Sequence, residues 1–255
     1  MTAPGTALVT GAARRIGRAI AIDLARAGWN VAVHYHSSAD DAARVVAEIA
    51  GAGGRAVALA ADLMQEAQTR ALVGRAAAAL GPVTCLVNNA SVFENDVAET
   101  VTRETWDAHM ETNLRAPFAL MQDLAAALPP ETSGNVINLI DERVWNLTPY
   151  FVSYTVSKAG LWALTQTMAL ALAPRIRVNA IGPGPTLPSP RQSPAQFERQ
   201  WAAMPLRRGT TPAEICDAVR FILAAPAMTG QMIALDGGRH LGWTHPGATI
   251  EANEE

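Results

Sequence analysis

The chain has 255 residues, of which 49% are hydrophobic and only 17% are charged, a composition that allows a large core and excludes an intrinsically disordered protein. Its formal charge is only −3, it has no run of Lys or Arg, and no apolar stretch approaches the roughly 20 residues of a membrane span, so nucleic acid and membranes are not expected partners. Because the N-terminus also has no charged leader followed by an apolar signal core, we expect a cytoplasmic protein that binds a small molecule.

Short runs rich in Val, Ile, Leu and Ala recur along the chain, and each is typical of a strand buried on both faces. In chain order these runs cover residues 7–10, 31–35, 56–60, 83–88, 135–140, 177–181 and 232–235. Longer segments with helical periodicity lie between them, at residues 17–27, 39–50, 66–80, 106–127, 150–173 and 212–223. This alternation predicts a single α/β domain over residues 1–255, doubly wound and Rossmann-type, with about seven parallel strands flanked by helices.

Two segments fall outside this alternation. The Pro-rich stretch 182–194 follows the sixth predicted strand, and we expect it to begin a substrate lid that extends to about residue 205. The last residues, 244–255, are expected to form a tail that is either mobile or used in subunit contacts.

The segment after the first predicted strand is a glycine turn that leads into a helix. Gly11 and Gly17 bound this turn, and Arg15 stands where the usual dinucleotide-binding pattern has its middle glycine. A helix N-terminus offers free N–H groups and a positive dipole end, and glycine permits a close backbone approach. Ligands of an open parallel sheet bind beyond the carboxyl ends of its strands, so the turn predicts a pyrophosphate site.

The segment after the second predicted strand favours NADP(H) over NAD(H). NAD-specific sites place an acidic residue there, and an acid would repel a 2′-phosphate. This chain instead has His34, Tyr35, His36 and Ser37 at that position, with Arg15 in the neighbouring glycine turn. Cationic and hydroxyl donors of this kind suit a phosphate. The alternative is that the histidines are solvated loop residues.

A tyrosine and a lysine share one face of the long helix predicted at residues 150–173. Tyr154 and Lys158 are four residues apart, so the lysine ammonium lies near the phenol. A neighbouring cation favours the phenolate and should therefore lower the pKa of Tyr154 and ease proton exchange. Asp141 follows the fifth strand and Asn113 lies in the preceding helix, so we expect these side chains to converge on one pocket.

With these motifs the sequence resembles the short-chain dehydrogenases/reductases over essentially its whole length. The motifs are Thr10-Gly11 with Gly17, Asp62, Asn88-Asn89-Ala90, Asn113, Tyr154 with Lys158, Pro183-Gly184 and Asp236-Gly237-Gly238. The resemblance implies hydride transfer from a nicotinamide cofactor, with Tyr154 as proton donor, Lys158 on the ribose and Asn113 supporting a water-linked proton path. It also implies a homotetramer. The implied cofactor contacts include Ile16, Asp62 at the adenine, Leu63, Asn89, Ala90, Ser91, Pro183 and Gly184.

Within that family the sequence is most similar in its motifs to the pteridine reductases. The similar features are the loops at residues 12–17 and 34–38 and an aspartate, Asp141, thirteen residues before Tyr154, where most family members have serine. The resemblance implies that Asp141 acts with Tyr154 to protonate a pterin ring nitrogen. It further implies that Phe93 stacks on the pterin and that Ser91 is a hydrogen-bonding neighbour.

We therefore predict an NADPH-dependent reductase that transfers hydride to a pterin-like C=N bond, with Tyr154, Lys158 and Asp141 handling proton transfer. One alternative is a ketone or aldehyde reductase, or an alcohol dehydrogenase, in which Asp141 only makes a local turn or cap. Another is a non-catalytic NADP-binding regulator. No metal is expected, because His109, His240 and His245 show no ligand spacing.

Overall fold

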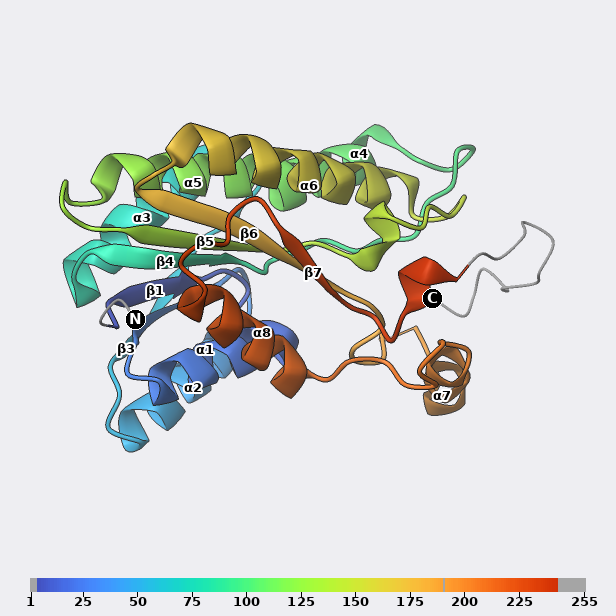
Figure 1. The fold of residues 1–255 in the computed structure, drawn as a ribbon, viewed down its shortest axis with the longest axis horizontal. Coiled ribbons are helices and arrows are strands. Elements are labelled where there is room, and N and C mark those ends of the chain that lie inside the picture. The colour runs from blue at the N-terminus through green and yellow to red at the C-terminus, as the bar shows by residue number, and fades with distance from the viewer. Residues whose placement is uncertain (1–3, 190, 243–255) are drawn as a thin grey trace.

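The structure, a computed structural model, describes residues 4–189 and 191–242, and within these residues seven parallel strands form one sheet (Figure 1). The strands are β1 (Thr6–Val9), β2 (Asn30–Tyr35), β3 (Ala56–Ala60), β4 (Val83–Asn88), β5 (Gly134–Leu139), β6 (Ile176–Pro183) and β7 (Met232–Leu235). Their order is β3-β2-β1-β4-β5-β6-β7, so the chain winds outward in both directions from the centre, and every neighbouring pair is parallel. The predicted doubly wound, Rossmann-type α/β fold is confirmed.

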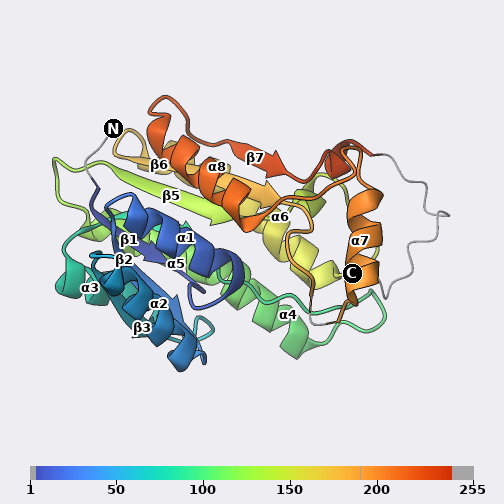
Figure 2. The ribbon, with the colours of Figure 1, turned by 90° about the horizontal axis from the view of Figure 1, so that it is seen from below.

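Helices cover both faces of this sheet (Figure 1). One face carries α1 (Arg15–Arg26), α2 (Ala39–Gly51) and α8 (Pro212–Ala224), and the other carries α3 (Glu66–Leu80), α4 (Arg103–Met110), α5 (Ala116–Ala127) and α6 (Val152–Leu172). Helix α7 (Pro194–Ala202) lies apart from both layers, at the end of the sheet to which the strands point (Figure 2). Among the residues described, no helix is both long and apolar enough to cross a lipid bilayer.

Successive residues of each strand pack into different cores on the two faces of the sheet. In β1, Ala7 and Val9 join the apolar cluster under α1 and α8, whereas Leu8 joins the cluster under α3 and α5. All three side chains are fully buried. This two-sided burial explains why the strands could be recognised as continuous apolar runs.

The single helix predicted at residues 106–127 is interrupted in the structure. A π-helical turn, Glu111–Arg115, separates α4 from α5, and it contains the predicted site residue Asn113. Helix α4 also begins earlier than predicted, at Arg103, because Thr102 and Thr105 form a capping box there. Apolar periodicity cannot reveal such a turn, since one extra residue shifts the pattern by little more than a quarter of a turn.

The segment predicted as an irregular lid contains a helix. Helix α7 begins after Ser193, whose side chain accepts from the backbone N–H of Gln196 in a capping box, and Pro194 occupies the first helical turn. A serine followed by proline and, three residues on, by glutamine is a helix start that the sequence analysis missed. We refer to residues 182–189 and 191–205 as the lid segment; its action as a lid stays a prediction. The predicted tail, 244–255, lies outside the described residues.

Candidate active site

Residues from the carboxyl ends of several strands line one cavity of about 290 Å³. Of the predicted site residues, it brings together Arg15, Ile16, Asn89, Ser91, Phe93, Asp141, Tyr154, Lys158, Pro183 and Gly184. The lid segment closes one side through residues that include Pro185, Leu187, Gln192 and Gln200. The remaining predicted residues do not line this cavity; they are Gly11, Gly17, His34, Tyr35, His36, Ser37, Asp62, Leu63, Ala90 and Asn113.

The phenol of Tyr154 is hydrogen-bonded to the carboxylate of Asp141. Tyr154 lies in the first turn of α6, and its hydroxyl donates to Asp141 Oδ2 at 2.8 Å. The other oxygen, Oδ1, accepts from the backbone N–H of Arg143 at 2.8 Å and so caps the short 3₁₀ helix η2 (Glu142–Val144). Asp141 therefore both caps a local turn and contacts the candidate proton donor.

Burial and the charge of Asp141 raise the pKa of Tyr154 well above its ordinary value. The prediction that the pKa of Tyr154 is lowered is wrong, because its shift has the opposite direction. Lys158 Nζ donates to the backbone oxygen of Leu139 at 2.8 Å and lies 5.8 Å from the centre of the Tyr154 ring. Burial also lowers the pKa of Lys158 to about 8. The phenol consequently keeps its proton, as a proton donor must.

Asn113 positions the segment that follows β4. Its Oδ1 accepts from the backbone N–H of Val92 at 2.8 Å, and its Nδ2 donates to the Val92 oxygen and to Ser157 Oγ, both at 3.0 Å. The side chain is fully buried. Asn113 thus fastens the stretch that carries Ser91 and Phe93 to helix α6, while its place in a proton path stays a prediction.

Phe93 stacks on an aromatic ring of the protein itself. Its ring is parallel to that of Phe151, with 4.4 Å between centroids, and meets Tyr154 edge-on at 4.7 Å. The guanidinium of Arg191, from the lid segment, lies over the Phe93 ring at 5.6 Å. Because Phe151 covers one face of Phe93, Arg191 lies on the face that a stacked substrate would need.

A buried polar chain lies behind the two phenylalanines. His109 is fully buried, and its Nε2 accepts from the backbone N–H of Glu94 at 3.1 Å. The proton of the neutral ring therefore lies on Nδ1, which donates to Ser153 Oγ at 2.7 Å, and Ser153 in turn donates to the carboxylate of Asp96. This chain ties the segment after β4 to the first turn of α6, where Tyr154 lies.

The glycine turn after β1 is too tightly packed for larger residues. Gly11 has a φ of +62°, and a Cβ on Gly17 would lie 2.3 Å from the oxygen of Gly11 and 2.4 Å from Asn89 Nδ2. Asn89 Nδ2 also donates to the backbone oxygen of Thr10 at 2.8 Å, and Ala90 donates its N–H to Thr10 Oγ1 at 3.0 Å. These motif residues therefore hold the turn against the start of α1, a geometry that fits a pyrophosphate.

His34 does not supply the cationic donor that was expected of it. The side chain is buried, its Nδ1 accepts from the backbone N–H of Gly11 at 3.1 Å, and its Nε2 lies 3.1 Å from the oxygen of Ala61. Burial lowers the pKa of His34 to about 4, so the ring is neutral and shapes the glycine turn. His36 and Ser37 are exposed at the end of β2 and remain the candidate phosphate donors there.

Arg15 contacts the lid segment. Its guanidinium donates to the backbone oxygens of Leu187 and Pro188, at 3.1 and 3.0 Å. Asp62 follows β3, and its Oδ1 accepts from the backbone N–H of Met64 at 3.0 Å. Within the described ranges, no group of three or more His, Cys, Asp or Glu side chains is placed to hold a metal ion.

Three charged cavity residues were not assigned to the site by sequence reasoning. Glu142 and Arg143 lie in η2, and Arg239 follows β7 at the start of the 3₁₀ helix η3 (Arg239–Leu241). Arg143 lines the cavity and donates to Thr148 Oγ1 at 2.6 Å. The rule that ligands bind beyond strand ends, applied to the seventh strand, would have found Arg239.

The chain is similar to known reductases over most of its length. Residues 11–240 match the family model described as enoyl-(acyl carrier protein) reductase. The 3-oxoacyl-(acyl-carrier-protein) reductase of Staphylococcus epidermidis is 33% identical over 241 residues, which cover 92% of this chain and 99% of that protein.

Solved structures with the same fold include two cofactor complexes. FolM alternative dihydrofolate reductase 1 from Brucella suis, in complex with NADP, is 49% identical, with a TM-score of 0.93 and coverage of 96% of this chain and 99% of that chain. A blue fluorescent protein from a metagenomic library, in complex with NADPH, is 33% identical, with a TM-score of 0.86 and coverage of 92% and 97%. Each of these two crystal structures contains the phosphorylated form of the nicotinamide cofactor.

Proposed function

Because the chain belongs to the short-chain dehydrogenase/reductase family, we propose that it is an NADPH-dependent reductase acting on a C=N bond of a pterin-like ring. The observation that carries this proposal is the hydrogen bond of 2.8 Å from the Tyr154 hydroxyl to Asp141 Oδ2 in the cavity. The 49% identity to the Brucella suis protein, which is named an alternative dihydrofolate reductase, supports the same choice of substrate class.

In this reaction the ring carbon gains a hydride and the ring nitrogen gains a proton. Bound NADPH supplies the hydride. Tyr154 would supply the proton, because its phenol is protonated at neutral pH and lines the cavity beside Asp141. Asp141 accepts a hydrogen bond from this phenol, and a carboxylate stabilises a protonated or amino-bearing heterocycle better than it does the alkoxide that forms in carbonyl reduction.

The residues around the glycine turn fit the proposed cofactor. The turn bounded by Gly11 and Gly17 would hold the pyrophosphate, and Arg15, His36 and Ser37 would offer donors to the 2′-phosphate. The buried ammonium of Lys158 lines the same cavity as Tyr154 and would hold the nicotinamide ribose. These residues would hold the cofactor beside the Tyr154 hydroxyl and would take no part in bond breaking.

A second candidate function is reduction of a carbonyl group. The matching family model and the Staphylococcus epidermidis relative are both named for reductases of acyl-carrier-protein substrates, and this favours a carbonyl or enoyl substrate. In that case the contact of Asp141 Oδ1 with the N–H of Arg143 would be the main role of Asp141, as the cap of η2.

The test is a substrate panel with saturating NADPH. It contains dihydrobiopterin, dihydromonapterin and dihydrofolate on one side, and ketones, aldehydes and a 3-oxoacyl thioester on the other. The proposal expects turnover of at least one dihydropterin well above that of a Tyr154→Phe variant. Pterin turnover no higher than that of the variant, together with turnover of a carbonyl compound, would favour the second function. If the protein binds NADPH but none of these compounds causes NADPH oxidation, the alternative of a non-catalytic NADP-binding regulator would be favoured.

The assembly belongs to the same proposal. We propose a single catalytic domain that works in the cytoplasm as a homotetramer, as the resemblance to the family implies. Light scattering of the purified chain tests the tetramer, and a monomer with full activity would reject it.

A further inference from the structure

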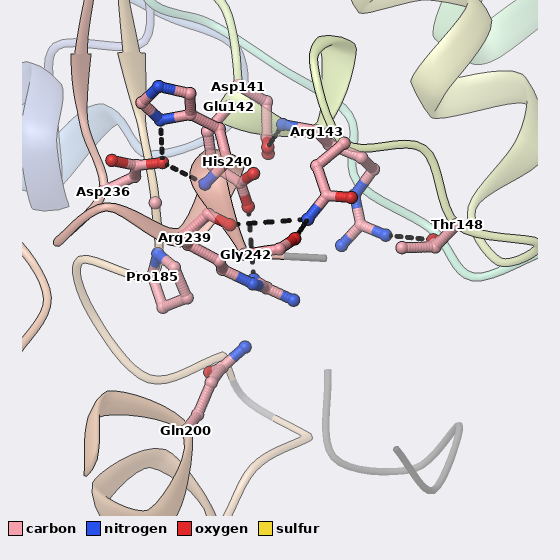
Figure 3. A network of polar contacts seen from close by, with 12 residues as sticks. Asp141, Glu142, Arg143, Thr148, Pro185, Gln200, Asp236, Arg239, His240 and Gly242 are labelled. Carbon is pink, nitrogen blue, oxygen red and sulfur yellow. Dashed lines mark hydrogen bonds and ion pairs between the residues drawn. The ribbon is translucent and has the colours of Figure 1, made fainter. Parts of the chain in front are cut away.

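Two arginines form one wall of the cavity, away from the glycine turn. Arg143 comes from η2, after β5, and Arg239 comes from η3, after β7, so the ends of the two strands on either side of β6 place them on one wall (Figure 3). Arg239 Nη1 lies 3.3 Å from Glu142 Oε1. The Arg143 guanidinium lies 5.1 Å from the centre of the Phe151 ring, which holds it in place. This wall, which we call the arginine wall, is defined by Arg143, Glu142 and Arg239.

The carboxyl of Glu142 does not cancel the charge of the arginine wall. Glu142 is only 3% exposed, and its Oε2 has no hydrogen-bond partner among the described residues. Burial, and then the charge of Asp141, raise the pKa of Glu142 to about 8, while Arg239 and Arg143 lower it and Asp236 raises it further. The wall holds two guanidinium groups against a single carboxyl whose neutral form is favoured by burial, so it has net positive charge.

The turn that carries Arg239 is fixed independently of Glu142. Asp236 accepts from the backbone N–H of Gly238 at 3.0 Å and from that of His240 at 2.7 Å, and its Oδ2 also lies 2.7 Å from His240 Nδ1. Asn146 donates to the backbone oxygen of Arg239 at 3.5 Å. The guanidinium of Arg239 is thus presented to the cavity by a turn with its own contacts (Figure 3).

Amide groups face the arginine wall from the lid segment. Figure 3 shows Gln200 of α7 across from Arg239, with its side chain directed toward that turn. Gln192 donates from Nε2 to Gln200 Oε1 at 3.0 Å, and both residues line the cavity. A group bound between this pair and the wall would meet guanidinium and amide donors, which together suit a carboxylate.

We propose that Arg239, with Arg143 beside it, binds a carboxylate on the side chain of the substrate, so that the cavity prefers pterins with an acidic side chain to those with a neutral one. This rests on the proposed function for the identity of the ring. The planar guanidinium of Arg239 offers two parallel N–H donors to such a carboxylate, a geometry that lysine cannot reproduce.

The test compares folate and biopterin, two ligands with the same oxidised ring. Folate ends in a glutamate and biopterin in a neutral dihydroxypropyl group. Calorimetry would measure the binding of each to the protein saturated with NADP⁺. We expect the wild type to bind folate about tenfold tighter than biopterin, as one charge-assisted contact predicts. Arg239→Gln should remove this preference and leave the affinity for biopterin unchanged within about twofold.

Two further variants separate a role in binding from a role in folding. Arg239→Lys keeps the charge without the paired donors, and should retain part of the preference for folate. Arg103→Gln removes an arginine of α4 whose side chain is 82% exposed, outside the cavity, and should bind both ligands like the wild type.

The outcomes also distinguish this inference from the proposed function. The inference would be overturned if Arg239→Gln weakened the binding of both ligands equally or left the preference for folate unchanged. It would also be overturned if the wild type bound neither ligand or showed no preference between them. If folate is preferred through Arg239 but no dihydropterin is reduced, the inference stands and the proposed function fails. If dihydropterins are reduced while Arg239→Gln leaves the binding of both ligands unchanged, the proposed function stands and the inference fails.

Discussion

Tyr154, Asp141 and Lys158 lie on the sheet side of the cavity, whereas Arg191 and α7 lie on the opposite side, in the lid segment. The first group is held by buried contacts to strand ends and to α6, such as the 2.8 Å bond from Lys158 Nζ to the oxygen of Leu139. Arg191 makes exposed contacts instead, including an ion pair of 3.0 Å with Glu94. We infer that the sheet side fixes the reaction and the lid segment adjusts which ligand enters, so variants on the two sides should differ in size and kind of effect.

The largest effect is expected at Tyr154. Replacing it by Phe removes the hydroxyl that donates to Asp141, and with it the proposed proton donor. We expect kcat to fall by about 10²–10⁴-fold, the usual contribution of a positioned general acid, with NADPH affinity unchanged. Steady-state kinetics and cofactor titration would measure both. A variant with kcat near the wild-type value would remove Tyr154 from the reaction.

A stability effect of about 3 kcal/mol is expected at His34, since one pKa unit corresponds to about 1.4 kcal/mol. The pKa of His34 is lowered from 6.5 to about 4, so the neutral ring stabilises the fold fully above pH 6.5, and this contribution is lost as the pH falls toward 4. His34→Gln keeps an acceptor and a donor but does not titrate. The wild type should therefore lose more unfolding free energy between pH 7 and pH 4 than this variant.

Urea unfolding at several pH values would measure the difference. His36→Gln, at an exposed position on the same strand end, is the matched control and should follow the wild type. Parallel curves for His34→Gln and the wild type would mean that the buried ring does not resist protonation.

A smaller effect on stability, with a second effect on binding, is expected at Asn113. Asn113→Ala leaves the partly buried N–H of Val92 without its acceptor, which costs about 1–3 kcal/mol. It also loosens the stretch with Ser91 and Phe93, so KM for the substrate should rise. Asn30→Ala removes a comparable amide, which donates to the oxygen of Leu80 at 3.2 Å, on β2 and outside the cavity. This control should be destabilised with an unchanged KM. A raised KM in the control as well would contradict the positioning role of Asn113 in substrate binding.

The smallest effect is expected in the lid segment. Arg191 covers the outer face of Phe93 at 5.6 Å, an exposed cation–π contact of about 0.5–1 kcal/mol. Arg191→Ala should therefore lower KM for the substrate about two- to fivefold, with kcat retained. Arg44→Ala, on the exposed surface of α2, should leave KM unchanged. A higher KM in Arg191→Ala would show that Arg191 binds the substrate instead of competing with it.

The sheet side was also the side that the sequence predicted best. Strand-end positions and helical spacing located Asp141 and Tyr154, because both depend on local periodicity. The neutral state of His34 could not be predicted, since its burial depends on the contact of β2 with the glycine turn. The pairing of Glu142 with Arg239 likewise arises only when β5 and β7 segments meet in space. Helix α7 left a sequence signal in Ser193 and Gln196, which the proline-rich surroundings concealed.

The proposed choice of substrate depends most on Asp141, and replacing this residue by serine is the most direct test. The ratio of kcat/KM for a dihydropterin to that for a ketone would be compared in the wild type and in Asp141→Ser. We predict that the wild type favours the dihydropterin and that the variant reduces this ratio by at least about 10²-fold, since the carboxylate no longer assists ring protonation. An unchanged ratio, or a wild type that already favours the ketone, would contradict the proposed role of Asp141.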